Sequence, residues 1–152
     1  MYPPDSIRVA VEQDIPLLYA MDHIAAYDAG RREFIARAVS EGCCTVYETE
    51  HGIAGYTVLE YTFFELGFVS LLYVQASHRR RGIGAALMRN LEARCTTCKL
   101  FTSTNLSNLP MQRLLSRLGY VLAGVVHHLD ENDPEVFYVR YLSSDATADT
   151  AP

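Results

Sequence analysis

The sequence predicts a single α/β (α+β) domain with a mixed, mostly antiparallel central sheet flanked by helices. The chain has 152 residues, 49% hydrophobic and 20% charged, a balance typical of a globular protein with a substantial core. Strand-like and helix-like segments follow one another: antiparallel hairpins come first, and a strand–helix–strand crossover comes after them. This order favours a mixed sheet.

The first half of the chain is expected to form a strand, two helices and a hairpin. Pro16 is tolerated in the first turn of a helix, and Gly42 is typical of the position just beyond a helix end. Segments with β-branched residues and alternating polarity then flank a turn at His51 and Gly52. The expected elements are a strand at 7–11, a helix beginning at 12–16 with Leu17, Leu18 and Met21 on one face, a helix at 31–40, and strands at 44–49 and 53–61.

The second half begins with an apolar strand, 68–74, which is expected to be buried on both faces. A helix at 82–94 follows, with Ile83, Ala86, Leu87 and Leu91 on its inner side. The remaining elements are a strand at 99–103, a helix at 108–118 closed by Gly119, and a final hairpin of strands 120–129 and 135–142. The domain is therefore expected to cover 1–142, and the small, polar segment 143–152 is expected to be disordered.

Charge and cysteine content exclude several classes of protein. The net charge of −5 gives no overall attraction to nucleic acid or anionic lipid, and no apolar segment is long enough to cross a bilayer. Residues 1–5 lack a secretory signal pattern, so the four cysteines are expected to be free thiols in the cytoplasm. The Cys95–Cys98 spacing suggests zinc or redox chemistry, but adjacent Cys43 and Cys44 cannot supply a matching ligand pair, so no metal site is expected.

The motif Arg79-x-x-Gly82-x-Gly84 lies between the buried strand and the helix that follows it. Amide groups at a helix start are unpaired and carry partial positive charge, and glycines let a phosphate approach the backbone closely. An anion site is therefore expected in this loop.

Three phosphate- or nucleic-acid-binding patterns do not fit the loop. A nucleotide triphosphate loop needs Lys and Ser or Thr after its last glycine, but Gly84 is followed by Ala85. A dinucleotide fingerprint needs a small residue where Leu87 stands, and it usually opens an amino-terminal βαβ unit. DNA binding would need a basic helix face, which is absent from this acidic chain.

The motif resembles the acetyl-coenzyme A pyrophosphate loop of the GNAT superfamily of N-acetyltransferases, and its flanks strengthen the resemblance. Residues 72–74 look like the end of that family's fourth strand, and Asn108 followed by Gly119-Tyr120 is similar to its Asn…Gly-Phe/Tyr signature. The resemblance covers about residues 7–142. It implies the GNAT fold, acetyl-coenzyme A as acetyl donor, and direct attack by a primary amine of a small molecule or peptide amino terminus.

The resemblance also implies coenzyme-binding positions. The backbone of Leu72 and Val74 would pair with the pantetheine arm, and the Leu72 amide would polarise the thioester carbonyl. Arginines of the loop would meet phosphates, with a solvated turn as the alternative reading. The implied cofactor-binding residues are Leu72, Val74, Arg79, Arg80, Arg81, Gly82, Ile83, Gly84, Ala85 and Asn108.

The sequence departs from the family at two positions that handle protons in many members. Leu115 stands where many relatives have a tyrosine, and Ser103 where some have a glutamate. Tyr61 and Glu65, at the turn between the third and fourth strands, are the remaining candidates for proton acceptors. The alternative is structural, with Tyr61 as a half-buried strand aromatic and Glu65 as a turn charge. An acetyl-coenzyme A-binding module with weak or lost catalysis is the alternative function.

The expected partners are an amine acceptor and the coenzyme, with no nucleic acid and no membrane; a homodimer is left open. Asp130, Glu131, Asp133 and Glu135 cluster in the last hairpin turn, where they would attract a cationic acceptor or simply be solvated.

Overall fold

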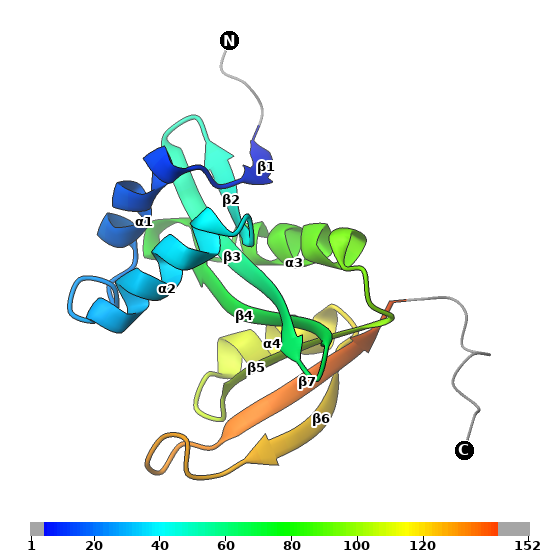
Figure 1. Ribbon diagram of the computed structural model, residues 1–152. Coiled ribbons are helices and arrows are strands. Elements are labelled where there is room, and N and C mark those ends of the chain that lie inside the picture. The colour runs from blue at the N-terminus through cyan, green and yellow to red at the C-terminus, as the bar shows by residue number, and fades with distance from the viewer. Residues whose placement is uncertain (1–4, 143–152) are drawn as a thin grey trace. The chain divides into compact units, whose positions relative to one another are not determined.

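The computed structural model describes residues 5–142, shown in Figure 1. Its elements are β1 (Ser6–Val9), η1 (Glu12–Asp14), α1 (Ile15–Met21), α2 (Ala29–Ser40), β2 (Cys44–Thr49), β3 (Gly52–Phe63), β4 (Leu66–Val74), η2 (Ala76–His78), α3 (Ile83–Arg94), β5 (Lys99–Asn105), α4 (Leu109–Arg117), β6 (Val121–Val126) and β7 (Glu135–Tyr141). Seven strands follow the order β1-β2-β3-β4-β5-β7-β6. The predicted fold class, a mostly antiparallel sheet with helices, is confirmed. The expected tail 143–152 lies outside the described residues.

The described part of the chain divides into two compact units. The first contains the described residues up to Glu60 together with Val69–Ala93, and the second contains Tyr61–Phe68 with the residues from Arg94 onward. In the first unit β1 pairs antiparallel with β2, and β2 with β3. Helices α1 and α2 cover one face of these strands and α3 covers the other (Figure 1).

Strand β4 packs on both faces in the first unit, as its apolar sequence predicts. Leu71 belongs to the core beneath α1 and α2, and Tyr73 packs against that core. Leu72 and Val74 pack instead against the cluster formed with α3. This alternation follows from the two-residue period of a strand.

The inner face of α1 differs from the expectation in one residue. Leu18 is fully buried, but Leu17 is 56% exposed. Leu17 lies about 100° around the helix from Leu18, on a side that the rest of the protein leaves uncovered. The prediction that Leu17 lies on the inner face is wrong.

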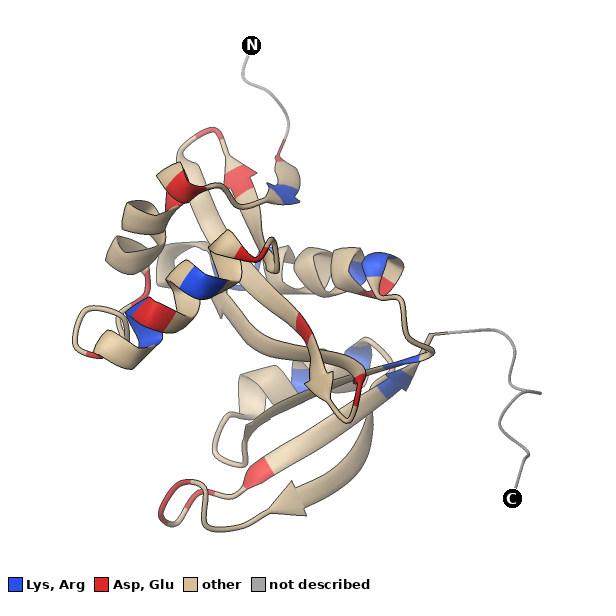
Figure 2. Cartoon of the chain, viewed as in Figure 1, with Lys and Arg blue, Asp and Glu red and all other residues tan. Residues whose placement is uncertain are grey.

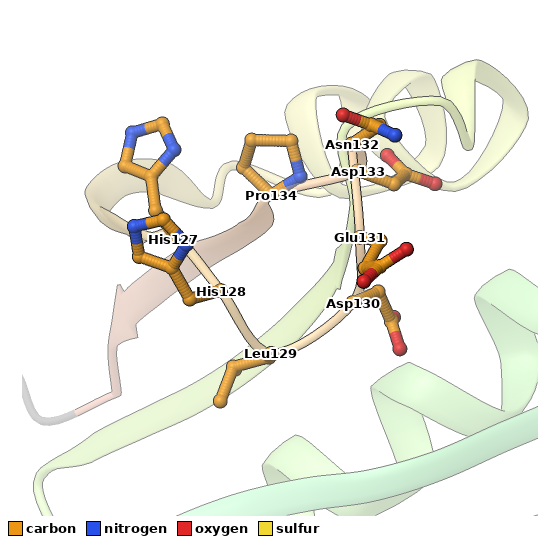
Figure 3. A pocket seen from close by; sticks show the side chains of 8 residues that line it. All are labelled: His127, His128, Leu129, Asp130, Glu131, Asn132, Asp133 and Pro134. Atoms are coloured by element: carbon orange, nitrogen blue, oxygen red, sulfur yellow. The ribbon is translucent and has the colours of Figure 1, made fainter.

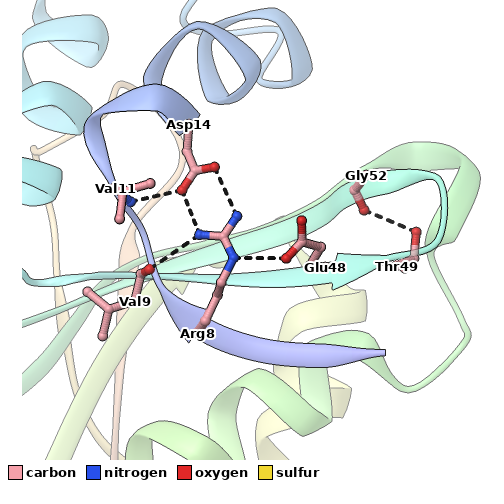
Figure 4. Close-up of polar contacts among 7 residues, drawn as sticks. All are labelled: Arg8, Val9, Val11, Asp14, Glu48, Thr49 and Gly52. Atoms are coloured by element: carbon pink, nitrogen blue, oxygen red, sulfur yellow. Dashed lines mark hydrogen bonds and ion pairs between the residues drawn. The ribbon is translucent and has the colours of Figure 1, made fainter. Parts of the chain in front are cut away.

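Arg8 connects β1 to the turn before α1 and to β2. Its guanidinium donates to both carboxylate oxygens of Asp14, at 2.8 and 3.0 Å, and its Nε donates to Glu48 at 2.8 Å (Figure 4). The hydrogen bond from Arg8 holds the pKa of Asp14 below its ordinary value, against an opposing effect of burial, and the Val11 amide adds to the lowering. This network fixes β1 to the turn before α1 and to β2.

The second unit is built on β5, β7 and β6, paired antiparallel, with the adjoining ends of β3 and β4. Phe63 lies at its aromatic centre, 4.9 Å from the Phe68 ring centroid, 5.2 Å from Phe101 and 5.7 Å from Phe137. Strand β6 ends at Val126, before the predicted boundary at residue 129, and a register shift interrupts it near Gly124. His128 has φ +73°, a left-handed conformation that cannot continue a strand.

Two further observations bear on the expectations from composition. Among the described residues, no helix combines the length and apolar character needed to cross a membrane. The four cysteines are free thiols, and burial raises the pKa of Cys44 to about 12, so this thiol is unreactive at neutral pH.

Candidate functional site

The loop between β4 and α3 has a backbone shape suited to an anion. Arg80 has φ +62° and Gly82 has φ +80°, so the chain reverses sharply just before α3 begins at Ile83. A Cβ on Gly82 would meet no atom within 4 Å, so the backbone is open on that side. The Gly82 carbonyl accepts the Ala86 amide at 3.0 Å, and the earlier amides of α3 have no acceptor within the helix itself. These amides and the helix dipole offer positive potential to a phosphate.

The helix behind this loop is held firmly in the first unit. Ile83 is 4% exposed, and Leu87 and Leu91 are fully buried, as predicted for its inner side. Ala86, also predicted there, is only half-buried, and Met88 is fully buried in addition. Gly55 on β3 permits this packing: a Cβ there would lie 3.3 Å from Leu87 and 3.4 Å from Ile83. The first turn of α3 is therefore positioned by core packing rather than by the loop alone.

The three arginines of the loop differ in what they contact. Arg79 donates from Nε to the Val74 carbonyl at 2.9 Å, and its guanidinium lies 5.9 Å from the centre of the Tyr73 ring. Arg79 thus ties the loop back to the end of β4. Arg80 and Arg81 are exposed, so their charges are available to a ligand in solution.

The two β4 residues predicted to bind the coenzyme present their backbone on one edge of the strand. The Gln75 amide donates to the Ala54 carbonyl on β3 at 2.8 Å. In an antiparallel pair, alternate residues direct their amide and carbonyl groups to opposite sides. Gln75 and Tyr73 therefore bond toward β3, and Leu72 and Val74 present theirs on the opposite edge. The next strand in the sheet order on that side of β4 is β5, so pairing of this backbone with an extended ligand stays a prediction.

Tyr61 and Glu65 lie at the hairpin end of β3 and β4, in the second unit. The Tyr61 hydroxyl accepts the Thr96 amide at 3.1 Å, and the Tyr61 side chain is 39% exposed. Glu65 is exposed and has φ +63°, next to Phe64 at +51°, so it occupies a tight turn. It directly precedes β4, which begins at Leu66. A role of either residue in proton transfer stays a prediction.

Asn108 begins α4 in the second unit. Its Oδ1 accepts the Met111 amide at 3.2 Å, so it is the N-cap of the helix. Leu115, on the same helix, is fully buried. It is a core residue in the position where the family often has a tyrosine.

The acidic turn between β6 and β7 surrounds a pocket of about 640 Å³ lined by residues 127–134 (Figure 3). Asp133 accepts the Ser107 hydroxyl at 2.6 Å, and Asp130 accepts from the Asn105 amide group at 2.8 Å. The acidic residues gather at the tip of this hairpin (Figure 2). Two of them therefore hold the turn against the segment between β5 and α4.

A buried polar group that no sequence motif indicated lies at the start of the connection between α1 and α2. Asp22 is fully buried and accepts the Tyr56 hydroxyl and, at 3.0 Å, Arg31 Nε. The next residue, His23, has its Nδ1 3.0 Å from the Tyr73 hydroxyl. These contacts join residues far apart in the chain. The one local signal was an aspartate directly after an apolar helix, which is a weak indication.

Comparison with known proteins agrees with this geometry. Residues 11–120 match the model of the acetyltransferase (GNAT) family. The chain belongs to the GNAT acetyltransferase family. It is therefore an acetyltransferase, and acetyl-coenzyme A is its acetyl donor.

Solved structures with the same fold cover nearly all of this acetyltransferase. A GNAT-family acetyltransferase from Bacillus cereus is 29% identical, with a TM-score of 0.85, over 93% of this chain and 99% of that one. The ribosomal-protein-S18-alanine N-acetyltransferase from Escherichia coli is 17% identical, with a TM-score of 0.76, over 91% and 94%. The protein yncA of Salmonella typhimurium, described as a candidate acetyltransferase with its cofactor acetyl-coenzyme A, is 18% identical, with a TM-score of 0.75, over 98% and 100%. Comparison with curated proteins found no significant match.

The start of α3 fits the diphosphate of the coenzyme. The backbone at Gly82 is open and curved, two exposed arginines flank it, and the helix contributes its amino-terminal amides. The whole chain carries a net charge of −5, so the arginines of this loop form a local basic patch on an acidic protein.

Proposed function

We propose that this GNAT acetyltransferase moves the acetyl group of acetyl-coenzyme A to a primary amine, of a small molecule or of a peptide amino terminus. The observation that carries the proposal is the open, left-handed backbone at Arg80 and Gly82 directly before the 12-residue helix α3. Peptide acceptors are included because one structural neighbour is named for an alanine of a ribosomal protein.

The loop residues hold the coenzyme in this proposal. Backbone amides from Arg81 to Ala85 bind the diphosphate, with the dipole of α3 behind them. The side chains of Arg80 and Arg81 add charge-assisted hydrogen bonds. Arg79 acts differently from its neighbours, because its contact with Val74 keeps the loop joined to β4.

The strand residues orient the reacting thioester. The backbone of Leu72 and Val74 aligns the pantetheine arm, and the Leu72 amide donates to the acetyl carbonyl oxygen. A donor aimed at the developing negative charge accelerates acyl transfer. Bound acetyl-coenzyme A supplies an activated acetyl carbon, and no covalent enzyme nucleophile is required.

The departing thiolate needs no tyrosine in this proposal. A thiol ionises readily enough to leave as an anion, and the positive end of α3 favours negative charge nearby. Buried Leu115 is compatible with such a reaction. It also supports the second candidate, a coenzyme-binding module with little or no catalysis, because a proton donor common in the family is missing.

Turnover with a panel of amines separates the two candidates. The panel contains small primary amines and peptides with free amino termini, one beginning with alanine, and release of free coenzyme A is measured against pH. An enzyme releases coenzyme A with at least one amine, and its rate rises through the neutral range as the acceptor loses its proton. Tight coenzyme binding with no acetylated product from any amine would favour the module.

A further inference from the structure

The connection between α1 and α2 is anchored unusually firmly at its first residue. Asp22 is fully buried, and its two carboxylate oxygens accept four donors: the Tyr56 hydroxyl, Arg31 Nε at 3.0 Å, and the amides of Ile24 and Ala25 at 2.9 and 3.3 Å. Burial by itself would raise the pKa of Asp22, but the bonds from Tyr56 and Arg31 outweigh it and lower the pKa. The carboxylate therefore stays charged and fixed in place.

His23 is exposed and follows this anchor directly. Its Nδ1 lies 3.0 Å from the Tyr73 hydroxyl, and the two ring centroids are 5.8 Å apart. Tyr73 is itself held from two sides, by the Tyr56 ring at 6.0 Å and by the Arg79 guanidinium at 5.9 Å. One ring nitrogen of His23 is thus engaged, and the geometry leaves Nε2 for another partner.

Tyr73 connects His23 to the part of β4 where the acetyl transfer is proposed to take place. It lies between Leu72 and Val74, the two residues whose backbone is proposed to align the thioester. All of these residues belong to the first unit. The hydrogen-bond contact between His23 and Tyr73 therefore brings an imidazole to this part of β4.

We propose that His23 is the general base of the acetyl transfer and that Tyr73 is its positioning residue; this rests on the proposed N-acetyltransferase function. In the tautomer that this role requires, the Nδ1–H group donates a hydrogen bond to the Tyr73 hydroxyl oxygen, and Nε2 carries the lone pair that accepts the proton. Imidazole is the side chain best suited to exchange a proton near neutral pH. The contact with Tyr73 holds the ring through Nδ1, so Nε2 is the nitrogen that is placed to accept the proton.

The proposed reaction accounts for each proton and each electron pair in order. The acceptor ammonium gives one proton to Nε2 of His23, directly or through one water. The nitrogen lone pair then forms a bond to the acetyl carbon, and the carbon–sulfur bond breaks with its electron pair on sulfur. The second proton of the new nitrogen–carbon adduct is lost to solvent, and His23 returns its own proton to water or to the thiolate.

The groups that face His23 set the pH dependence of this step. They are Tyr73 on β4 and, beyond it, Arg79 over the same ring and Tyr56 on β3. The Asp22 carboxylate lies on the same connection, but its oxygens are directed to Tyr56 and Arg31. Tyr73 is therefore the direct contact through which His23 is held.

The experiment compares His23→Gln and Tyr73→Phe with wild type, using Tyr27→Phe as the control. Tyr27 lies in the same connection but is 93% exposed. For each protein, kcat and KM are measured against pH with the best amine of the panel, acetyl-coenzyme A affinity is measured by titration calorimetry, and the melting temperature is recorded.

His23→Gln is expected to lower kcat about 100-fold at neutral pH, the size typical of a lost general base. The loss should shrink as pH rises, because the amine then deprotonates without help. Tyr73→Phe should shift the pH profile and lower kcat by about tenfold, while coenzyme affinity and melting temperature stay near wild type in both variants. Tyr27→Phe should match wild type throughout.

Two results would overturn the inference alone: kcat of His23→Gln close to that of an active wild type, or an equal loss at every pH. A wild type that binds no acetyl-coenzyme A, or that acetylates no amine, would overturn the proposed function and this inference with it. The calorimetric titration of the wild type distinguishes these cases.

Discussion

At the scale of single residues, Asp22 shows how much one side chain can determine. Its four donors come from β3, from α2 and from its own connection, so it joins segments that no local pattern relates. A buried carboxylate with this many partners is stable only while it remains charged.

Asp22→Asn is expected to lower the free energy of unfolding by about 2–3 kcal/mol, since hydrogen bonds to a charged group are lost. Asp28→Asn is the control, because Asp28 caps α2 by accepting the Arg31 amide at 3.2 Å and asparagine caps equally well. Urea unfolding at neutral pH measures both. Equal stability of the two variants would contradict the assigned anchor.

Asp22 should also make the free energy of unfolding depend on pH. The folded state lowers the pKa of Asp22, so its contribution is complete above the ordinary carboxyl range of about 4 and is lost as pH falls through the folded value. The stability difference between wild type and Asp22→Asn should therefore narrow in acid. If the stability difference between wild type and Asp22→Asn instead widened below pH 4, the assignment of a lowered pKa to Asp22 would be contradicted.

Two roles are considered for the Asn108 side chain: cap of helix α4 and ligand of the coenzyme. Asn108→Ala should cost about 1 kcal/mol of stability because the Met111 amide loses its acceptor, and Asn108→Ser should restore most of it. Calorimetric titration with acetyl-coenzyme A separates the two roles. If affinity falls in both variants while stability recovers in the serine variant, the amide also binds the coenzyme.

At the scale of elements, the positions of α3 and its loop depend on two glycines with different roles. Gly82 supplies a backbone conformation, with φ +80° and open space around it. Gly55 supplies space, because a Cβ there would lie 2.9 Å from the Tyr73 carbonyl oxygen. The first shapes the loop, and the second lets β4 and α3 approach β3.

Gly82→Ala is expected to cost about 1 kcal/mol from left-handed strain and to weaken acetyl-coenzyme A binding about tenfold or more. Gly42→Ala is a matched control: its φ is +74° and its surroundings are equally open, but it lies at the end of α2. Both variants should lose similar stability in thermal unfolding. Loss of affinity in both, or in neither, would contradict the site.

Gly55→Ala is expected to destabilise the fold by about 1–3 kcal/mol, because backbone of β4 must move to admit the methyl group. Gly124→Ala, in β6, is the control, since a Cβ there meets nothing within 4 Å. Denaturant midpoints should separate the two variants clearly. If Gly55→Ala were as stable as the control, β4 could move to admit the methyl group at little cost, and the prediction would be wrong.

Local sequence patterns predicted which helices and strands form better than they predicted which side chains contact one another. The apolar strand and the arginine–glycine loop could be identified because each depends on one short segment of sequence. The same holds for the buried stripe of Ile83, Leu87 and Leu91, whose residues are four apart on one helix. The hydrogen bond between His23 and Tyr73 could not, since 50 residues separate them. The β3–β4 turn was also unexpected in form: Phe64 and Glu65 both adopt positive φ, where glycine or asparagine is usual.

At the scale of the whole molecule, an acidic chain carries a basic loop at the start of one helix. The net charge of −5 opposes binding of a polyanion in general, so binding of the coenzyme depends on local geometry rather than on long-range attraction. Affinity for acetyl-coenzyme A should therefore depend more on the loop backbone than on any single arginine.

Calorimetric titration with acetyl-coenzyme A tests the central claim most directly. Wild type is expected to bind in the range from about 1 μM to 1 mM that is usual for enzyme substrates. Gly84→Val should bind at least about tenfold more weakly, because its side chain obstructs the approach of the diphosphate to the first turn of α3. Ala93→Val, an exposed substitution at the other end of the same helix, should bind like wild type. No heat of binding to folded wild type at millimolar ligand would contradict the account, and so would equal affinity of wild type and Gly84→Val.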